Sequence, residues 1–202
     1  MGKVAIKHHL SKSKIKVKFL NIKVIAHPEQ SNYFKTIRNR FPGRFNGVDV
    51  LDIGSLDING NNRYLFSNYS YTGVDLGPGN NVDVVSRGHE YKPNKQYDIV
   101  ISSECFEHDE FWPLTLQNMI DLTKSGGLVL FSCATTGRPE HGTRRTTPQD
   151  SPFTSKIEND YYKNVTAKMV LHEVDIESQF SQFEFFSRQT WPQDLYFFGF
   201  KK

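Results

Sequence analysis

Two apolar segments, each with an acidic residue at its end or one position before it, have the residue types and the spacing that a ligand site needs. The first, residues 48–53, leads into Gly54, and the second, residues 71–75, ends at Asp75, about twenty residues after Asp52. This spacing is that of one strand–helix–strand step. Glycine lets the backbone turn sharply beside a ligand, and the second carboxylate stands where a ribose diol can donate two hydrogen bonds to it. The pattern therefore predicts a nucleoside site.

The loop after Gly54 argues against a dinucleotide as the ligand. A dinucleotide fold needs Gly-x-Gly-x-x-Gly, so that a pyrophosphate can sit against a helix N-terminus, whereas this loop continues Ser55-Leu56-Asp57-Ile58. The Asp57 carboxylate would repel a phosphate. The loop therefore suits a cationic ligand better.

Later segments continue the alternation of strands, helices and turns. Residues 96–102 predict a strand that runs into Ser103-Glu104-Cys105-Phe106-Glu107-His108. Residues 122–131 predict the end of a helix, a Gly-Gly turn and a further strand, and residues 183–186 and 195–200 predict a closing antiparallel pair.

Taken in order, these segments resemble the class I S-adenosylmethionine-dependent methyltransferases, in the small-molecule, type 11-like branch that has a Glu-His pair after the fourth strand. The resemblance covers roughly residues 27 to 202. In that family the first loop reads Asp/Glu-x-Gly-x-Gly-x-Gly. Asp52 and Gly54 match this pattern, whereas Leu56 and Ile58 depart from it.

The resemblance implies an α/β, Rossmann-like methyltransferase fold, with a seven-stranded mixed sheet in the order 3-2-1-4-5-7-6 and helices on both faces. It also implies S-adenosyl-L-methionine as the cofactor, whose sulfonium and ammonium groups are cationic. The residues expected to bind it are Asp52, Gly54, Ser55, Asp57, Asp75, Leu76, Gly88, His89, Ser103 and Glu104.

The chain divides into a basic N-terminal arm, residues 1–27, and a methyltransferase domain, residues 28–202. The first 28 residues carry seven lysines and no acid, whereas the remainder has 18 basic and 22 acidic residues. Within the arm, residues 14–19 alternate between lysine and apolar side chains, which predicts a strand. The arm can serve as a nucleic-acid patch or as a solvated edge strand, and its lack of arginine and stacked aromatics favours the edge strand.

The expected core elements follow from apolar runs and turn signals. They are a helix from about Pro28 to Phe41 and strands at residues 48–53, 71–75, 82–85, 97–102 and 128–133. The segment from Ala134 to Lys163 has no periodicity and is rich in Thr, Arg, Pro and Gly. Because it leaves the carboxyl end of the fifth strand, where open α/β sheets bind ligands, we expect it to be the substrate loop. Arg138, Tyr161 and Tyr162 are its candidate substrate contacts.

Methyl transfer from a sulfonium is an in-line displacement, so the protein must position the acceptor and accept a proton from it. The candidate catalytic residues lie after the fourth and fifth strands: His141, His108, Glu107 and Glu140. His141 can be a base, a substrate ligand or a surface histidine, and His108 can instead orient the cofactor loop. No ligand spacing demands a metal, so none is assigned, although these residues with Asp109 could hold a divalent ion.

Two cysteines, Cys105 and Cys133, are too few for a secreted disulfide framework, which favours a cytoplasmic, reducing location. No apolar run approaches the ~20 residues needed to cross a bilayer.

The cysteines also raise an alternative function, an RNA cytosine methyltransferase with the basic arm as its RNA site, but the residues around them do not match that family's motifs. A non-catalytic scaffold subunit is a third possibility. The sequence favours an enzyme that methylates a hydroxyl or amine of a small metabolite, such as a sugar or natural-product intermediate, and leaves the oligomeric state open.

Overall fold

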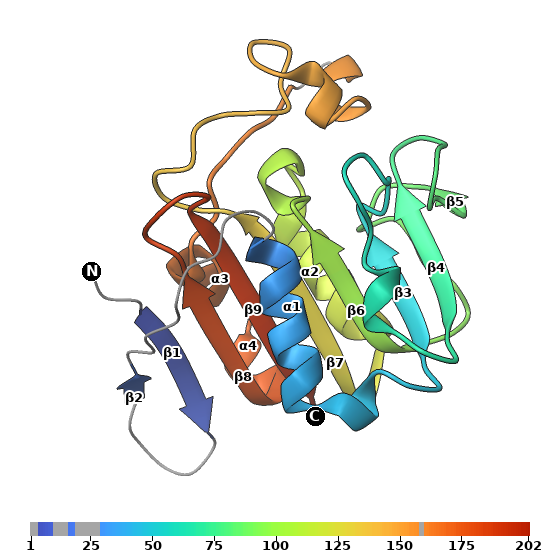
Figure 1. The fold of residues 1–202 in the computed structure, drawn as a ribbon, viewed down its shortest axis with the longest axis vertical. Helices are drawn as coiled ribbons and strands as arrows, with labels where there is room; N and C mark the ends of the chain where they lie inside the picture. The colour runs from blue at the N-terminus through green and yellow to red at the C-terminus, as the bar shows by residue number, and fades with distance from the viewer. Residues whose placement is uncertain (1–3, 10–15, 19–28, 158–159) are drawn as a thin grey trace.

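One mixed β-sheet organises the chain (Figure 1). The structure is a computed structural model that describes residues 4–9, 16–18, 29–157 and 160–202, the first two segments as backbone only. In this part of the chain the sheet has nine strands in the order β2-β1-β8-β9-β7-β6-β3-β4-β5. Their bounds are β1 (Val4–His9), β2 (Lys16–Lys18), β3 (Asp49–Ile53), β4 (Ser70–Asp75), β5 (Val84–Val85), β6 (Tyr97–Ser103), β7 (Thr123–Ala134), β8 (Phe180–Ser187) and β9 (Asp194–Lys201).

The predicted strand order is confirmed. When the strands from β3 onward are counted as one to seven, they lie in the order 3-2-1-4-5-7-6. The five strands from β5 through β4, β3 and β6 to β7 run parallel to one another, whereas β9 is antiparallel to both β7 and β8.

β1 and β2 add to the seven predicted strands. β1 pairs antiparallel with β8, from Val4 opposite Ser187 to His9 opposite Gln182, and β2 pairs with β1. The segment 4–9 of the predicted arm therefore joins the domain's own sheet. Lys14, Ile15 and Phe19 of the predicted alternation lie outside the described residues, as does Pro28, the predicted start of the first helix.

Helices cover both faces of the sheet, because its central strands are apolar on both sides. They are α1 (Glu29–Arg40), α2 (Trp112–Leu122), α3 (Ala167–Glu173) and α4 (Ile176–Gln179). α1 lies in front of the sheet in Figure 1 and packs Phe34 and Ile37 into a cluster with Ile101. α2 lies behind it and contributes Leu116 and Ile120 to the larger cluster on the other face.

The larger cluster centres on Phe197 of β9, which is fully buried. Its ring stacks on Phe131 at a centroid distance of 5.0 Å and an interplanar angle of 15°. Phe185 and Phe180 lie 4.8 and 5.3 Å from it. These rings join β7, β8 and β9, so the antiparallel pair is fixed to the parallel half of the sheet.

The step between β3 and β4 contains no α-helix, which differs from the predicted strand–helix–strand unit. Its described residues form only a 3₁₀ turn, η2 (Arg63–Leu65). The reason is the sequence of residues 59–62, Asn-Gly-Asn-Asn, because these residue types hydrogen-bond locally and favour turns over helix. β7 also begins five residues earlier than expected, and the predicted Gly-Gly turn is an irregularity within it, with Gly126 at φ +73°.

The described helices include none that is long and apolar enough to span a membrane.

Replacing Phe197 with alanine tests how far the fold depends on this cluster. Removing a fully buried ring leaves a cavity, so Phe197→Ala should lower the free energy of unfolding by about 3–5 kcal/mol in urea titrations. Leu171→Ala on α3, where the side chain is 40% exposed, is the matched control and should change it by less than about 1 kcal/mol. Equal effects of the two substitutions would contradict the assignment of Phe197 to the centre of the core.

Candidate functional site

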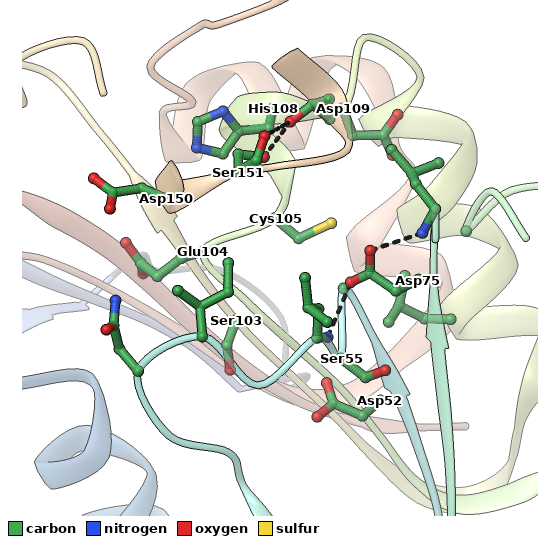
Figure 2. A pocket seen from close by; sticks show the side chains of 18 of the residues that line it. Asp52, Ser55, Asp75, Ser103, Glu104, Cys105, His108, Asp109, Asp150 and Ser151 are labelled. Atoms are coloured by element: carbon green, nitrogen blue, oxygen red, sulfur yellow. Dashed lines mark hydrogen bonds between the residues drawn. The ribbon is translucent and has the colours of Figure 1, made fainter. Parts of the chain in front are cut away.

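A cavity of about 720 Å³ lies at the carboxyl ends of β3, β4 and β6 (Figure 2). The start of α1 and the loop after β7 complete its wall. This is the edge at which open α/β sheets bind ligands, because the chain reverses there and leaves a crevice between neighbouring strands.

The turn after β3 requires glycine. Gly54 has φ +77°, a backbone conformation that other residues rarely adopt. The amide groups of Gly54 and Ser55 both donate to the Val74 carbonyl, at 2.9 and 3.1 Å. A Cβ on Gly54 would lie 2.7 Å from the Cβ of Cys105, so the loop after β6 comes as close to this turn as atoms allow.

Asp75, at the end of β4, is fixed in the cavity wall by backbone amides. Its carboxylate accepts hydrogen bonds from the N–H groups of Leu56 (3.0 Å) and Leu76 (2.7 Å). Burial raises the pKa of Asp75, and the backbone hydrogen bonds oppose that shift. The side chain is therefore held in one orientation, with its carboxylate at the cavity.

Asp52 is more deeply buried, at 2% exposure, and is only partly satisfied. One carboxylate oxygen accepts hydrogen bonds from the Tyr71 hydroxyl and, at 3.4 Å, from the Asn62 amide. The other oxygen has no hydrogen-bond partner. Burial raises the pKa of Asp52 to about 7.

The charge of the cavity is predominantly negative. Its described lining contains eight carboxylic acids but only three Lys or Arg side chains. The Ser55 hydroxyl, like one oxygen of Asp52, is buried without a partner. A cation with hydrogen-bond donors would complement these groups, whereas a phosphate would be repelled.

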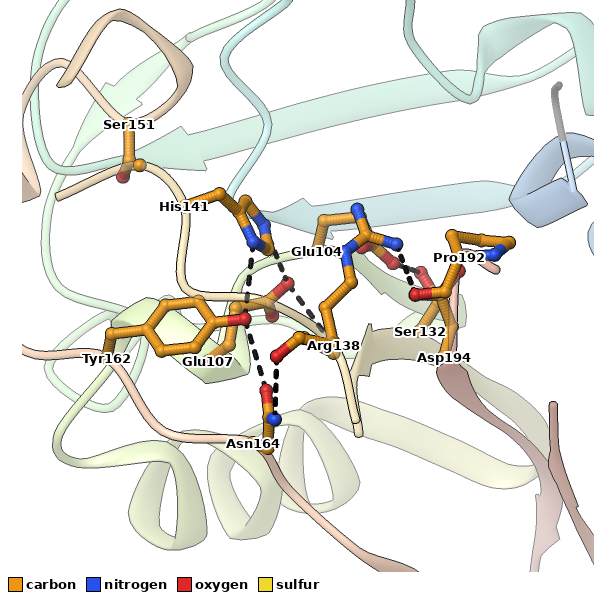
Figure 3. A network of polar contacts seen from close by, with 12 residues as sticks. Glu104, Glu107, Ser132, Arg138, His141, Ser151, Tyr162, Asn164, Pro192 and Asp194 are labelled. Carbon is orange, nitrogen blue, oxygen red and sulfur yellow. Dashed lines mark hydrogen bonds and ion pairs between the residues drawn. The ribbon is translucent and has the colours of Figure 1, made fainter. Parts of the chain in front are cut away.

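A second group of polar residues lies where the loop after β7 meets the 3₁₀ turn η3 (Phe106–His108) (Figure 3). His141 Nδ1 lies 3.1 Å from the Pro139 carbonyl and 3.2 Å from the Tyr162 hydroxyl. On the other side of the ring, His141 Nε2 lies 3.8 Å from a carboxylate oxygen of Glu107. The rings of His108 and His141 meet edge to face at 5.2 Å.

Burial sets the protonation of this group. Glu107 is fully buried, and burial raises its pKa to about 7, although its carboxylate accepts a hydrogen bond from the Ala134 amide at 3.2 Å. Burial lowers the pKa of His108 to about 4 and also lowers that of His141. At neutral pH both imidazoles are therefore uncharged and can offer lone pairs.

The loop after β7 is tied across the cavity at two places. Arg138 donates to the Pro192 carbonyl at 2.7 Å and to the Asp194 carboxylate at 3.0 Å (Figure 3). At the other end, the Phe153 ring packs so tightly on Gly77 that a Cβ there would lie 2.3 Å from it. The loop therefore covers the cavity from β9 to the end of β4.

Most of the predicted site residues lie in one place. The cavity lining includes Asp52, Gly54, Ser55, Asp75, Leu76, Gly88, Ser103, Glu104, His108, Arg138, His141 and Tyr161. Glu107 and Tyr162 lie behind His141 rather than in the lining.

Three predicted residues are held elsewhere. Asp57 accepts hydrogen bonds from the Gly60 amide and the Asn61 side chain, so it shapes its own loop. His89 packs on the Phe111 ring at 4.6 Å. Glu140 pairs with Arg145 and accepts a hydrogen bond from Thr143.

Some lining residues carry no signal in the sequence. They are Asn62, Arg87 and Phe153. Asn62 lies in a turn-forming run that masks its buried role. Phe153 is a large apolar residue in a polar loop, and that contrast is the one signal that could have identified it.

Comparison with known proteins supports the assignment of a methyltransferase fold. A family model described as a methyltransferase domain matches residues 26–200. A comparison with curated proteins found no match.

Three solved structures are similar to this chain. The N-methyltransferase NodS from Bradyrhizobium japonicum WM9, in complex with S-adenosyl-L-homocysteine, has 12% identity, covers 86% of each chain and gives a TM-score of 0.56. The N-terminal domain of EvdMO1, determined in the presence of S-adenosyl-L-homocysteine and D-fucose, has 13% identity over 87% of this chain and 84% of its own, with a TM-score of 0.58. Phosphoethanolamine N-methyltransferase 2 from Haemonchus contortus, with S-adenosyl-L-methionine, has 15% identity over 84% of this chain and 52% of its own, with a TM-score of 0.58. These likenesses show the fold.

The buried Asp52 should make the stability of the ligand-free protein depend on pH. Because its pKa is raised to about 7 on folding, the folded state holds a proton that the unfolded state releases near pH 4, and stability falls as pH rises through this window. Asp52→Asn should remove this contribution, which is at most about 4 kcal/mol between pH 4.5 and 8. Urea unfolding of both proteins at the two pH values measures it. Parallel pH profiles would contradict the assignment.

Proposed function

The chain belongs to the family of methyltransferase domains, and on that premise we propose that it transfers a methyl group from S-adenosyl-L-methionine to a hydroxyl or amine of a small metabolite. The observation that carries the proposal is the Asp75 carboxylate, fixed by two backbone amides at the rim of an acidic cavity. A sugar or another natural-product intermediate is the acceptor class that we favour.

The residues of the first two strand ends fit the cofactor. Asp75 would accept hydrogen bonds from the ribose diol, and the turn at Gly54 would leave space for the nucleoside. The unpaired oxygen of Asp52 and the Ser55 hydroxyl are buried groups that the polar, cationic end of the cofactor would satisfy. When bound, the cofactor supplies a methyl group activated by a positive sulfur, and its transfer to a hydroxyl leaves a neutral thioether and one proton to be removed.

The acceptor side is formed by the loop after β7. Arg138, His141 and Tyr161 line the cavity from this loop, and His108 faces them from η3. These residues hold the acceptor and take up its proton at the cluster of Glu107, His108 and His141. Because the loop is tied to β9 and packed on Gly77, it also excludes water from the reacting groups.

A small acceptor is favoured over RNA for two reasons. Cys133, the nucleophile that an RNA cytosine enzyme would need, is fully buried and lies outside the cavity lining. Two of the similar structures also concern small molecules by their descriptions, one determined in the presence of D-fucose and the other being a phosphoethanolamine N-methyltransferase. The two free cysteines are compatible with the proposed cytoplasmic location. A scaffold role is disfavoured by Asp75, whose carboxylate is held at the cavity by backbone hydrogen bonds.

Calorimetric titration with S-adenosyl-L-methionine tests the proposal. Asp75→Ala removes two charge-assisted hydrogen bonds, each worth ~1.5–3 kcal/mol, so the dissociation constant should rise by about 100-fold or more. Asp121→Ala, a change of the same kind at an exposed position on α2, should leave the affinity unchanged. Absence of binding by the wild-type protein would favour the scaffold alternative, and unchanged affinity in Asp75→Ala would place the ribose contact elsewhere.

Selectivity between cofactors gives a second test. The connection after Gly54 has no α-helix, hence no helix N-terminus to receive a pyrophosphate, and the lining is acidic. At 100 times its dissociation constant, S-adenosyl-L-methionine should raise the melting temperature by about 5–10 °C, as should S-adenosyl-L-homocysteine. NAD at the same concentration should leave it unchanged. A comparable shift with NAD would overturn the cofactor assignment.

A further inference from the structure

Three side chains with metal-binding atoms converge beside the cavity. Glu107 and His108 come from η3, and His141 comes from the loop after β7. Figure 3 labels Glu107 and His141, and Figure 2 labels His108. One ligating atom of each lies within 4.8 Å of the other two. Their proximity is not a local effect of sequence, because more than thirty residues separate η3 from His141.

The hydrogen bonds of His141 fix which nitrogen faces the cluster. The Pro139 carbonyl, 3.1 Å from Nδ1, can only accept a hydrogen bond, which favours the tautomer that has its proton on Nδ1. Nε2 therefore presents a lone pair, and it is this atom that faces the Glu107 carboxylate at 3.8 Å. A metal-binding histidine has this arrangement, with the second nitrogen held by a backbone carbonyl. The Tyr162 hydroxyl, which also contacts Asn164, braces the same ring.

The other two side chains have buried atoms that lack partners. One carboxylate oxygen of Glu107 and Nδ1 of His108 have no hydrogen bond. Glu107 is fully buried and His108 is 7% exposed. Leaving such groups unsatisfied costs about 1–3 kcal/mol each, which is the cost that a bound partner would remove.

From these observations the geometry points to a divalent transition-metal site formed by Glu107, His108 and His141. Two neutral imidazoles and one carboxylate are a ligand set typical of Zn²⁺ and of Fe²⁺, Mn²⁺ or Co²⁺. Neighbouring ligand atoms around a tetrahedral ion lie roughly 3.3 Å apart, whereas the three atoms here lie within 4.8 Å of one another. Small side-chain rotations would therefore bring all three to coordination distance of one ion.

The position of the site indicates its use. His108 and His141 line the cavity, whereas Glu107 lies behind them, so the remaining coordination positions face the cavity. Resting on the proposed function, the ion would bind an acceptor that has a hydroxyl group at this wall and would make that hydroxyl easier to deprotonate. With the lone pairs of the cluster on the ion, the released proton would pass to another carboxylate of the cavity lining. The preferred acceptors would then carry an oxygen able to bind a metal, as a diol does.

The test uses Co²⁺ alone as the probe, added to the full chain after treatment with a chelator and removal of the chelator. The wild-type protein should bind one equivalent, with visible absorption bands of a low-symmetry site, and Zn²⁺ should displace it. His141→Ala and Glu107→Gln should each weaken binding by about 100-fold or more, because each removes one of three ligands. His172→Ala, at an exposed histidine on α3, is the matched control and should bind as the wild type does. Circular dichroism checks that each variant is folded.

The outcomes separate the metal site from the proposed function. Failure of the wild type to bind Co²⁺, or equal binding by all variants, would overturn the metal site. Calorimetry with S-adenosyl-L-methionine on the same metal-free protein reports on the cofactor site independently, since no cluster residue lies at the ends of β3 or β4. Binding of Co²⁺ without binding of the cofactor would support the metal site and overturn the proposed function.

Discussion

The contact between Gly54 and Cys105 is the constraint on which the rest of the site depends. β3 and β6 are parallel neighbours, and the chain leaves both strands at the same edge of the sheet. Because no side chain stands at Gly54, the two loops close to contact distance. The turn after β3 then places Leu56 against the Asp75 carboxylate, and the loop after β6 passes directly into η3 with Glu107 and His108. The two halves of the site are thus positioned by one close approach.

Burial of acidic groups is the second theme of the molecule. Asp52, Asp75, Glu104 and Glu107 all have pKa values raised by burial. Glu104 is held by a hydrogen bond from Ser132 and has φ +51°, an uncommon conformation for this residue type. Desolvating so many carboxylates opposes folding, so ligands that bring positive charge or hydrogen-bond donors recover stability when they bind.

The order of the strands and the position of Asp75 could be predicted from sequence, because both follow from local patterns that recur along the chain. The loop after β3 differs from the prediction for a local reason, whereas contacts between distant segments carry no signal in the sequence. Asp57 is expected to bind the cofactor, but its carboxylate accepts hydrogen bonds from Gly60 and Asn61, two residues of the same turn. The missing helix after β3 has the same cause, since four consecutive turn-forming residues outweigh the expected pattern. The meeting of His141 with Glu107 depends on how a loop of about thirty residues folds back, and no periodicity encodes that path.

The tethered loop has a kinetic consequence. Arg138 holds the loop to Asp194, whose carboxylate is almost fully buried, and Phe153 closes the opposite end over Gly77. Lifting the loop off the cavity requires at least one of these attachments to open. For any ligand whose exchange needs that movement, the frequency of the opening sets an upper limit on the rate of exchange, however fast the bond-making step becomes. The strength of the two attachments is thereby linked to the residence time of ligands beneath the loop.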